Sequence, residues 1–97
     1  MVVVYVQVKV KPEFLQAFKK KLQSNIDQSL QQTGCQRFEV YVDMVDPHTF
    51  VLYEEWATQD DFNAYQEADY FKAFGKWVFP KLDGAPNSSY YEATLIN

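Results

Sequence analysis

The feature that most constrains the fold is a strict alternation of side chains at the N-terminus. Residues 2–10 carry valine at every even position, and valine, tyrosine, glutamine and lysine stand between them. Period-two sequence rich in β-branched residues predicts a strand. Both faces of this strand begin with large apolar groups, and the same is true of residues 49–57 and 89–96. Any sheet built from these strands must therefore bury apolar side chains on both of its faces.

The segment between Pro12 and Gly34 has the spacing of an amphipathic helix. Proline is favoured in the first turn of a helix, and glycine is favoured where a helix stops. The apolar residues recur every three or four positions: Leu15, Phe18, Leu22, Ile26 and Leu30. This stripe predicts a helix that packs against the sheet.

A β-hairpin and a second helical region follow. Residues 37–43 and 49–57 alternate as strands, and the short Asp-Pro turn between them predicts a hairpin. Thr58 has the chemistry of an N-cap, and two aspartates follow it in the first turn of the helix. A break is expected near Ala68–Asp69, and Pro80 ends or kinks the helix. The apolar positions of this region are Phe62, Tyr65, Phe71, Phe74 and Val78.

Residues 82–89 are expected to form a loop, and residues 89–96 the last strand. The order is β-α-β-β-α-β, which predicts a ferredoxin-like α+β fold over residues 1–97 as one domain. In this fold a four-stranded antiparallel sheet carries both helices on one face. The opposite face is also apolar, and an exposed patch of this kind is an association site. The sequence therefore predicts a homodimer that packs sheet on sheet.

Composition and charge exclude several classes of function. The formal net charge of −4 makes nucleic acid and anionic membrane surfaces poor partners. No apolar run approaches the ~18–20 residues of a membrane span, and the N-terminus has the pattern of a strand, not of a signal peptide. Cys35 is the single cysteine, which indicates a reducing, cytoplasmic location. With His48 as the single histidine, the chain lacks the ligands of a zinc site.

Three stretches resemble a known family: "TGCQRFEVYVD", "DPHTFVLYEEW" and "DDFNAYQEADYFKAF". They are similar to the antibiotic-biosynthesis monooxygenase (ABM) family of small dimeric α+β-barrel proteins. The most specific parts are the Gly-Cys pair, the Asp-Pro turn and the Tyr-Glu-x-Trp of the third strand. The family includes cofactor-free oxygenases of quinol-like aromatics, haem-degrading enzymes and an isomerase. The resemblance therefore implies the fold more strongly than it implies one activity.

The chain departs from the family pattern at several positions. Tyr65 and Tyr70 stand where many members carry histidines. The haem-degrading branch has its ligating histidine at the place of Gly75, an asparagine near Val6 and a tryptophan near Tyr65. All three are missing here. The resemblance therefore implies no haem, no other cofactor and no tightly bound metal.

Glu54 is the candidate catalytic residue. It shares one face of the third strand with Phe50, Leu52 and Trp56. If that face meets the helices, burial raises the pKa of the carboxyl toward the range useful for a general base. A small aromatic or apolar ligand is expected to contact Trp56, Tyr65, Tyr70 and Phe38.

A purely structural interpretation of the same residues stays open. Glu54 could instead bind a backbone group, Arg37 or a lysine of a partner subunit, and Trp56 could be core or interface packing. Three functions follow from these alternatives. They are a cofactor-independent monooxygenase of a quinol or polyphenol, a non-redox isomerase with Glu54 as proton shuttle, and a non-enzymatic dimer that binds a small ligand.

Overall fold

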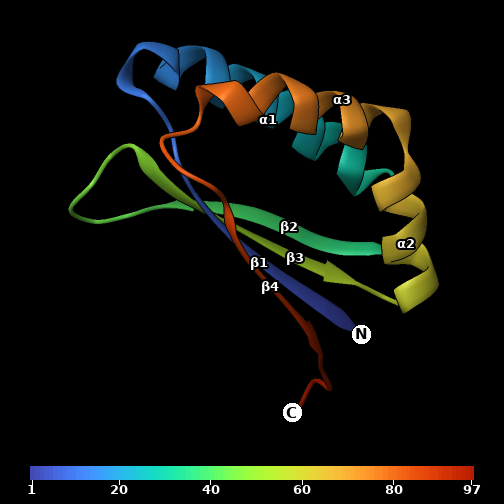
Figure 1. Ribbon diagram of the computed structural model, residues 1–97. Helices are drawn as coiled ribbons and strands as arrows, with labels where there is room; N and C mark the ends of the chain where they lie inside the picture. The colour runs from blue at the N-terminus through green and yellow to red at the C-terminus, as the bar shows by residue number, and fades with distance from the viewer.

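The computed structural model describes residues 1–97, which form a four-stranded antiparallel sheet with all of its helices on one face (Figure 1). The elements are β1 (Val2–Lys9), α1 (Leu15–Leu30), β2 (Cys35–Val42), β3 (Thr49–Trp56), α2 (Gln59–Glu67), α3 (Asp69–Val78) and β4 (Asn87–Glu92). Short 3-10 turns at Pro12–Phe14 and Phe79–Lys81 flank the helices. The strand order is β2-β3-β1-β4. The predicted ferredoxin-like α+β fold is confirmed.

The register of the strands decides which side chains meet the helices. Val4 of β1 lies opposite Glu54 of β3 on one side and Tyr90 of β4 on the other. Because side chains alternate along a strand, the even-numbered residues of these three strands point to the helical side. The core they form with the helices contains Val2, Val4, Val8, Val10, Phe18, Leu22, Phe38, Phe50, Leu52, Trp56, Phe62, Tyr65, Val78 and Leu82.

The first helix ends differently from the prediction. Its buried positions are Phe18, Leu22, Asn25 and Ser29, whereas Leu30 is 49% exposed. At about 100° per residue, Ser29 takes the place that faces the sheet in the last turn, and Leu30 is rotated away from it. The helix stops at Leu30, so Gly34 is not its cap. Gly34 instead has φ 86° in the turn that leads directly into β2.

Replacing Gly34 with alanine should destabilise the fold. An alanine at positive φ costs roughly 1–2 kcal/mol, and a Cβ at this position would also overlap the Asp61 side chain at the start of α2. Gly84 is the matched control, since its φ is 93° but a Cβ there meets no atom within 4 Å. Thermal melts should show a larger loss for Gly34→Ala than for Gly84→Ala. Equal losses would contradict the close approach of Gly34 to Asp61.

The second helical region breaks where the sequence predicts it. Ala68 has extended backbone and separates α2 from α3. The Thr58 side chain caps α2 by accepting a hydrogen bond from the Asp61 backbone N–H at 3.1 Å. None of the helices combines the length and the apolar character that crossing a membrane requires.

The last strand is shorter and earlier than predicted. It covers Asn87–Glu92, so the predicted range of 89–96 is wrong at both ends. The reason is its partner: β1 begins at Val2, and Val2 pairs with Glu92. Residues beyond Glu92 have no strand beside them, which leaves Leu95 and Ile96 exposed.

The face of the sheet away from the helices is open in the single chain (Figure 1). It combines aromatic and aliphatic groups with a small network of charges: Val3, Tyr5, Arg37, Glu39, Tyr41, Val51, Tyr53, Glu55 and Tyr91. Arg37 pairs with Glu39 at 2.7 Å and with Glu55 at 3.5 Å. The Tyr53 hydroxyl donates to Glu55 at 2.6 Å. We call this surface the outer face.

Candidate functional site

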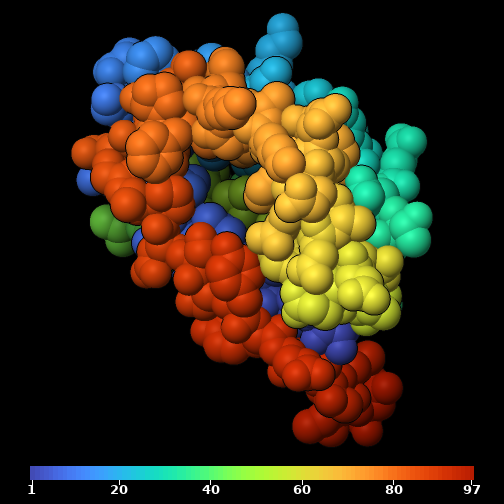
Figure 2. Space-filling model, turned by 45° about the vertical axis from the view of Figure 1, so that its right-hand side comes forward, coloured from blue at the N-terminus to red at the C-terminus, as the bar shows by residue number.

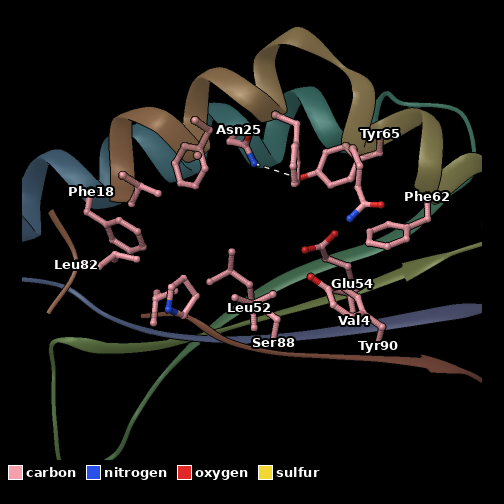
Figure 3. A pocket seen from close by; sticks show the side chains of 18 residues that line it. Val4, Phe18, Asn25, Leu52, Glu54, Phe62, Tyr65, Leu82, Ser88 and Tyr90 are labelled. Atoms are coloured by element: carbon pink, nitrogen blue, oxygen red, sulfur yellow. Dashed lines mark hydrogen bonds between the residues drawn. The ribbon is translucent and has the colours of Figure 1, made fainter. Parts of the chain in front are cut away.

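A cavity of about 200 Å³ lies between the sheet and the helices. Residues of β1, β3 and β4 form its floor, and residues of α1, α2 and α3 form its roof (Figure 3). Most of the lining is apolar. Its polar members are Asn25, Glu54, Tyr65, Gln66, Ser88 and Tyr90. An apolar hollow with a few polar groups is the usual form of a small-molecule site.

The cavity opens to the surface between α3 and β4. Figure 2 shows a hollow between the orange atoms of α3 and the red atoms of β4, with blue and green strand atoms visible at its base. The lining residues at this opening include Phe74 and Gly75 of α3, Pro86 just before β4 and Ser88 within it. A small ligand therefore has a path from solvent to the carboxyl of Glu54.

Glu54 is the ionisable group of this cavity. It is 4% exposed, and its carboxyl rises from β3 into the cavity (Figure 3). The Trp56 indole N–H donates to its Oε1 at 3.0 Å, while its Oε2 accepts no hydrogen bond from the protein. Burial raises the pKa of Glu54 to about 7 against the smaller opposing effect of the Trp56 hydrogen bond. The group can therefore take up and release a proton at neutral pH.

The suggested contact between Glu54 and Arg37 does not form. Arg37 lies on the outer face, where it pairs with Glu39 and Glu55. The pleat of the sheet separates the two side chains, because neighbouring residues of a strand point to opposite faces. No lysine or arginine of the chain lies within salt-bridge distance of Glu54. The carboxylate therefore has no cation to lower its pKa.

Trp56 lies behind Glu54, not on the cavity wall as expected. It is fully buried, and its ring stacks on Tyr65 with centroids 4.5 Å apart. It is not among the residues that line the cavity. Its indole N–H donates a hydrogen bond to Glu54, and in this way Trp56 orients the carboxyl without lining the cavity itself.

Of the two tyrosines expected in the site, one lines the cavity and the other lies outside it. Tyr65 lines the cavity, and its hydroxyl accepts a hydrogen bond from Asn25 Nδ2 at 3.4 Å. Burial, and next the charge of Glu54, raise the pKa of Tyr65 well above its usual value, so the hydroxyl stays protonated. Tyr70 instead donates to Gln32 at 2.9 Å and lines a smaller pocket of about 120 Å³ between α1 and α3. The break at Ala68 separates the two residues and turns Tyr70 away from the cavity.

Phe38 also lies outside the lining of the cavity. It is buried directly opposite Glu54 on β2. Since β2 is the edge strand farthest from β4, its side chains support the core on the side away from the opening. Cys35, at the start of the same strand, is a free thiol whose pKa is raised to about 11 by burial and, less strongly, by the charge of Glu54. It is therefore protonated and unsuited to act as a nucleophile at neutral pH.

Several cavity residues were not predicted from the sequence. Asn25 interrupts the buried side of α1 beside Ile26, and this polar residue within an apolar stripe was an available signal. Ser88 lay in the predicted loop, and Tyr90 had no assigned role. Their place in the cavity depends on the register of β4 against β1. Nowhere in the molecule do three or more His, Cys, Asp or Glu side chains gather in a way that could hold a metal ion.

Comparisons with known proteins point to one family. The family model described as "Antibiotic biosynthesis monooxygenase" matches residues 1–77. A Bacillus subtilis protein named "Putative monooxygenase YcnE" is 27% identical over 74 residues, which are 76% of this chain and 78% of that protein.

Solved structures agree with the sequence comparisons. The structure of a protein described as a "Putative antibiotic biosynthesis monooxygenase" from Nitrosomonas europaea matches with a TM-score of 0.89 and 28% identity, over 95% of this chain and 88% of that chain. A conserved protein from Methanosarcina mazei matches with a TM-score of 0.91 and 26% identity, over 96% and 92% of the two chains.

Proposed function

The chain belongs to the antibiotic biosynthesis monooxygenase family, and on this premise we propose that it is a cofactor-independent monooxygenase of a small quinol-like or polyphenolic aromatic. One observation carries the proposal. Glu54 presents a carboxyl oxygen, free of hydrogen bonds within the protein, to an apolar cavity, and its pKa is about 7. That is the group that such a reaction needs from the protein, since the substrate itself supplies the electrons.

The reaction begins with a proton transfer. The Glu54 carboxylate takes the proton of a substrate hydroxyl and leaves an electron-rich quinolate in the apolar cavity. The quinolate gives one electron to dioxygen, and the resulting pair of radicals joins by forming a bond between a ring carbon and oxygen. Loss of the second oxygen atom as water, with the proton returned by Glu54, yields a hydroxyquinone. One quinol and one dioxygen thus become one hydroxyquinone and one water, so the atoms and electrons balance.

The other residues that line the cavity also suit this chemistry. Tyr65 keeps its proton and can hydrogen-bond a substrate oxygen without competing as a base. Phe62, Phe71 and Phe74 offer aromatic surfaces to a flat ring. When the quinolate enters such a cavity it loses its shell of water molecules, and fixed protein groups take their place around it.

Oxygen uptake over a panel of quinols tests the proposal. We expect uptake of one dioxygen per quinol, and isotopically labelled dioxygen should place one labelled atom in the product and one in water. Proton exchange from a bound ligand without oxygen uptake would instead support an isomerase. Tight binding without turnover would support a ligand-binding protein. Either of these results would refute the monooxygenase.

We also propose that the protein is a homodimer joined through the outer face. No helix covers the outer face, where Tyr5 on the inner strand β1 is 38% exposed and Tyr91 on the edge strand β4 is 57% exposed. Tyr5 pairs with Tyr53 across β1 and β3, which extends the aromatic surface over two strands. A second copy placed on this surface by a two-fold axis would bury both sets of side chains.

Introducing a charge at Tyr5 should break the dimer. In Tyr5→Glu an unpaired carboxylate would lie in the interface near Glu39 and Glu55, at a cost of several kcal/mol. Tyr5→Phe is the matched control and should stay dimeric. Sedimentation or light scattering at micromolar concentration measures the difference. A monomeric wild-type protein, or a dimeric Tyr5→Glu variant, would refute the proposed interface.

A further inference from the structure

Gly75 lies inside a helix, at a position where the backbone gives no reason for a glycine. Helix α3 runs past it to Val78 and continues as a 3-10 turn, so Gly75 is not a helix cap. Its φ is not positive, unlike the φ of Gly34 and Gly84. A glycine inside a helix is less favourable than an alanine. The glycine at this position therefore needs another explanation.

Close packing does not require the glycine either. A Cβ at Gly75 would meet no side chain, and no backbone outside its own helix, within 4 Å. At Gly34, by contrast, a Cβ would overlap Asp61. An alanine would therefore fit at position 75 without displacing a neighbour. The missing side chain leaves a space that the folded chain does not fill.

The open space at Gly75 belongs to the mouth of the cavity. Phe71 and Val78, about one helical turn before and after Gly75, line the cavity together with it. Because residues three and four apart share one face of a helix, a side chain at position 75 would point to the cavity side. Gly75 is exposed to solvent, whereas Glu54 on the strand floor is 4% exposed. Position 75 therefore lies at the rim, on the path between solvent and Glu54.

The volume of the cavity limits how much of a ligand can be enclosed. A closed apolar cavity of about 150 Å³ accommodates benzene, and this cavity has about 200 Å³. It therefore encloses one aromatic ring, and a second, fused ring must extend toward the mouth. The mouth has Gly75 on one side and Pro86 and Ser88 on the other, and all three are exposed residues of the lining (Figure 2). A two-ring ligand that reaches Glu54 therefore passes beside position 75.

We propose that Gly75 is a specificity-determining residue: the space left by its missing side chain accommodates the second ring of a fused two-ring aromatic whose first ring contacts Glu54. The contact with Glu54 rests on the proposed function, whereas the fit at Gly75 depends on shape alone. A larger side chain at position 75 would narrow the mouth, and the inner part of the cavity would then accept one-ring ligands only. The glycine thus lowers the stability of α3 and keeps the mouth wide.

Calorimetric titration with 2-naphthol, which has two fused rings, and with phenol, which has one, tests this inference. The wild-type protein should bind 2-naphthol more tightly than phenol, because the second ring buries more apolar surface. Gly75→Leu should bind 2-naphthol at least about tenfold more weakly than the wild-type protein, since overfilling a packed space typically has an effect of this size. Its affinity for phenol should stay close to that of the wild-type protein. Lys76→Leu is the matched control, since Lys76 is the next residue of α3, is exposed and does not line the cavity. It should keep both affinities.

Thermal melts distinguish a narrowed mouth from a damaged fold. Gly75→Ala should melt about 4–8 °C higher than the wild-type protein, the shift that corresponds to the glycine penalty in a helix interior. It should also bind 2-naphthol less tightly, with a smaller loss than Gly75→Leu, and it replaces Gly75→Leu if the latter does not fold. A weaker affinity in a more stable variant cannot be caused by unfolding. A lower melting temperature of Gly75→Ala would show that the glycine is needed for packing and would overturn the inference.

The titrations also separate this inference from the proposed function. Unchanged binding of 2-naphthol by the Gly75 variants, an equal loss of phenol binding, an equal loss of 2-naphthol binding in Lys76→Leu, or no binding of 2-naphthol by the wild-type protein would overturn the role of Gly75. Because the titrations measure binding without turnover, a size preference that depends on Gly75 together with no oxygen uptake on any quinol would refute the monooxygenase alone.

Discussion

Replacing Glu54 with glutamine should lower the rate of oxygen uptake on a quinol by about 10²–10⁴-fold, the usual contribution of a general base. The amide has nearly the same shape as the carboxyl, and its oxygen can still accept the Trp56 indole N–H. It cannot take up the substrate proton. The rate of the wild-type enzyme should rise with pH through about 7, as Glu54 ionises, and the residual rate of Glu54→Gln should lack this rise.

The matched control for this substitution is Glu67→Gln. Glu67 lies at the end of α2, pairs with Lys72 on the surface and does not line the cavity. This variant should keep the wild-type rate. Rates are measured with an oxygen electrode and divided by the folded fraction from circular dichroism. If Glu54→Gln retains a rate in proportion to its folded fraction, Glu54 has a structural role and not the catalytic one.

The stability of the protein should fall as the pH rises from about 5 to about 8, and Glu54 should cause part of this fall. A carboxyl with a pKa of 4.5 in the unfolded chain and about 7 in the folded protein is neutral in both states at low pH. Above pH 7 it is charged in both states, and the folded state then carries the cost of burying that charge. This difference corresponds to about 3 kcal/mol of lost stability at high pH.

Urea denaturation of the wild-type protein and Glu54→Gln at pH 5 and pH 8 measures this effect. Glutamine cannot ionise, so the variant should gain up to about 3 kcal/mol over the wild-type protein between the two pH values. Other ionisable groups are common to both proteins and cancel in the comparison. The same pH dependence in both proteins would show that the Glu54 carboxyl is not buried in the folded state.

Both predictions concern the buried carboxyl of Glu54, which lowers the stability of the fold and also makes the group reactive at neutral pH. An uncharged residue at position 54 would give a more stable fold at neutral pH. Asn25 also lowers stability, because its buried Oδ1 has no hydrogen-bond partner. Buried polar groups that lower stability in this way are more often found at functional sites than in ordinary cores.

The parts of the site that follow strand periodicity could be predicted from the sequence. Alternation along the third strand puts Glu54 on one face with Phe50, Leu52 and Trp56, and the structure shows that this face is the buried one. Tyr65 lines the cavity because it belongs to the apolar stripe of α2. Trp56 has the predicted orientation, yet whether a buried side chain touches an empty space or its neighbours depends on how the helices pack above it. Periodicity could therefore not decide whether Trp56, Tyr70 and Phe38 touch the cavity, and none of them is among its lining residues.

The sequence by itself determined the order of the elements and the strand face that Glu54 shares with Phe50, Leu52 and Trp56. These are consequences of local periodicity, which each segment carries independently of the others. Only the tertiary structure decided that Asn25 and Ser88 reach the same cavity as Glu54, that Trp56 holds the carboxyl from behind and that β4 ends at Glu92. Each of these depends on the register or packing of segments far apart in the chain, and no single segment encodes such a relation.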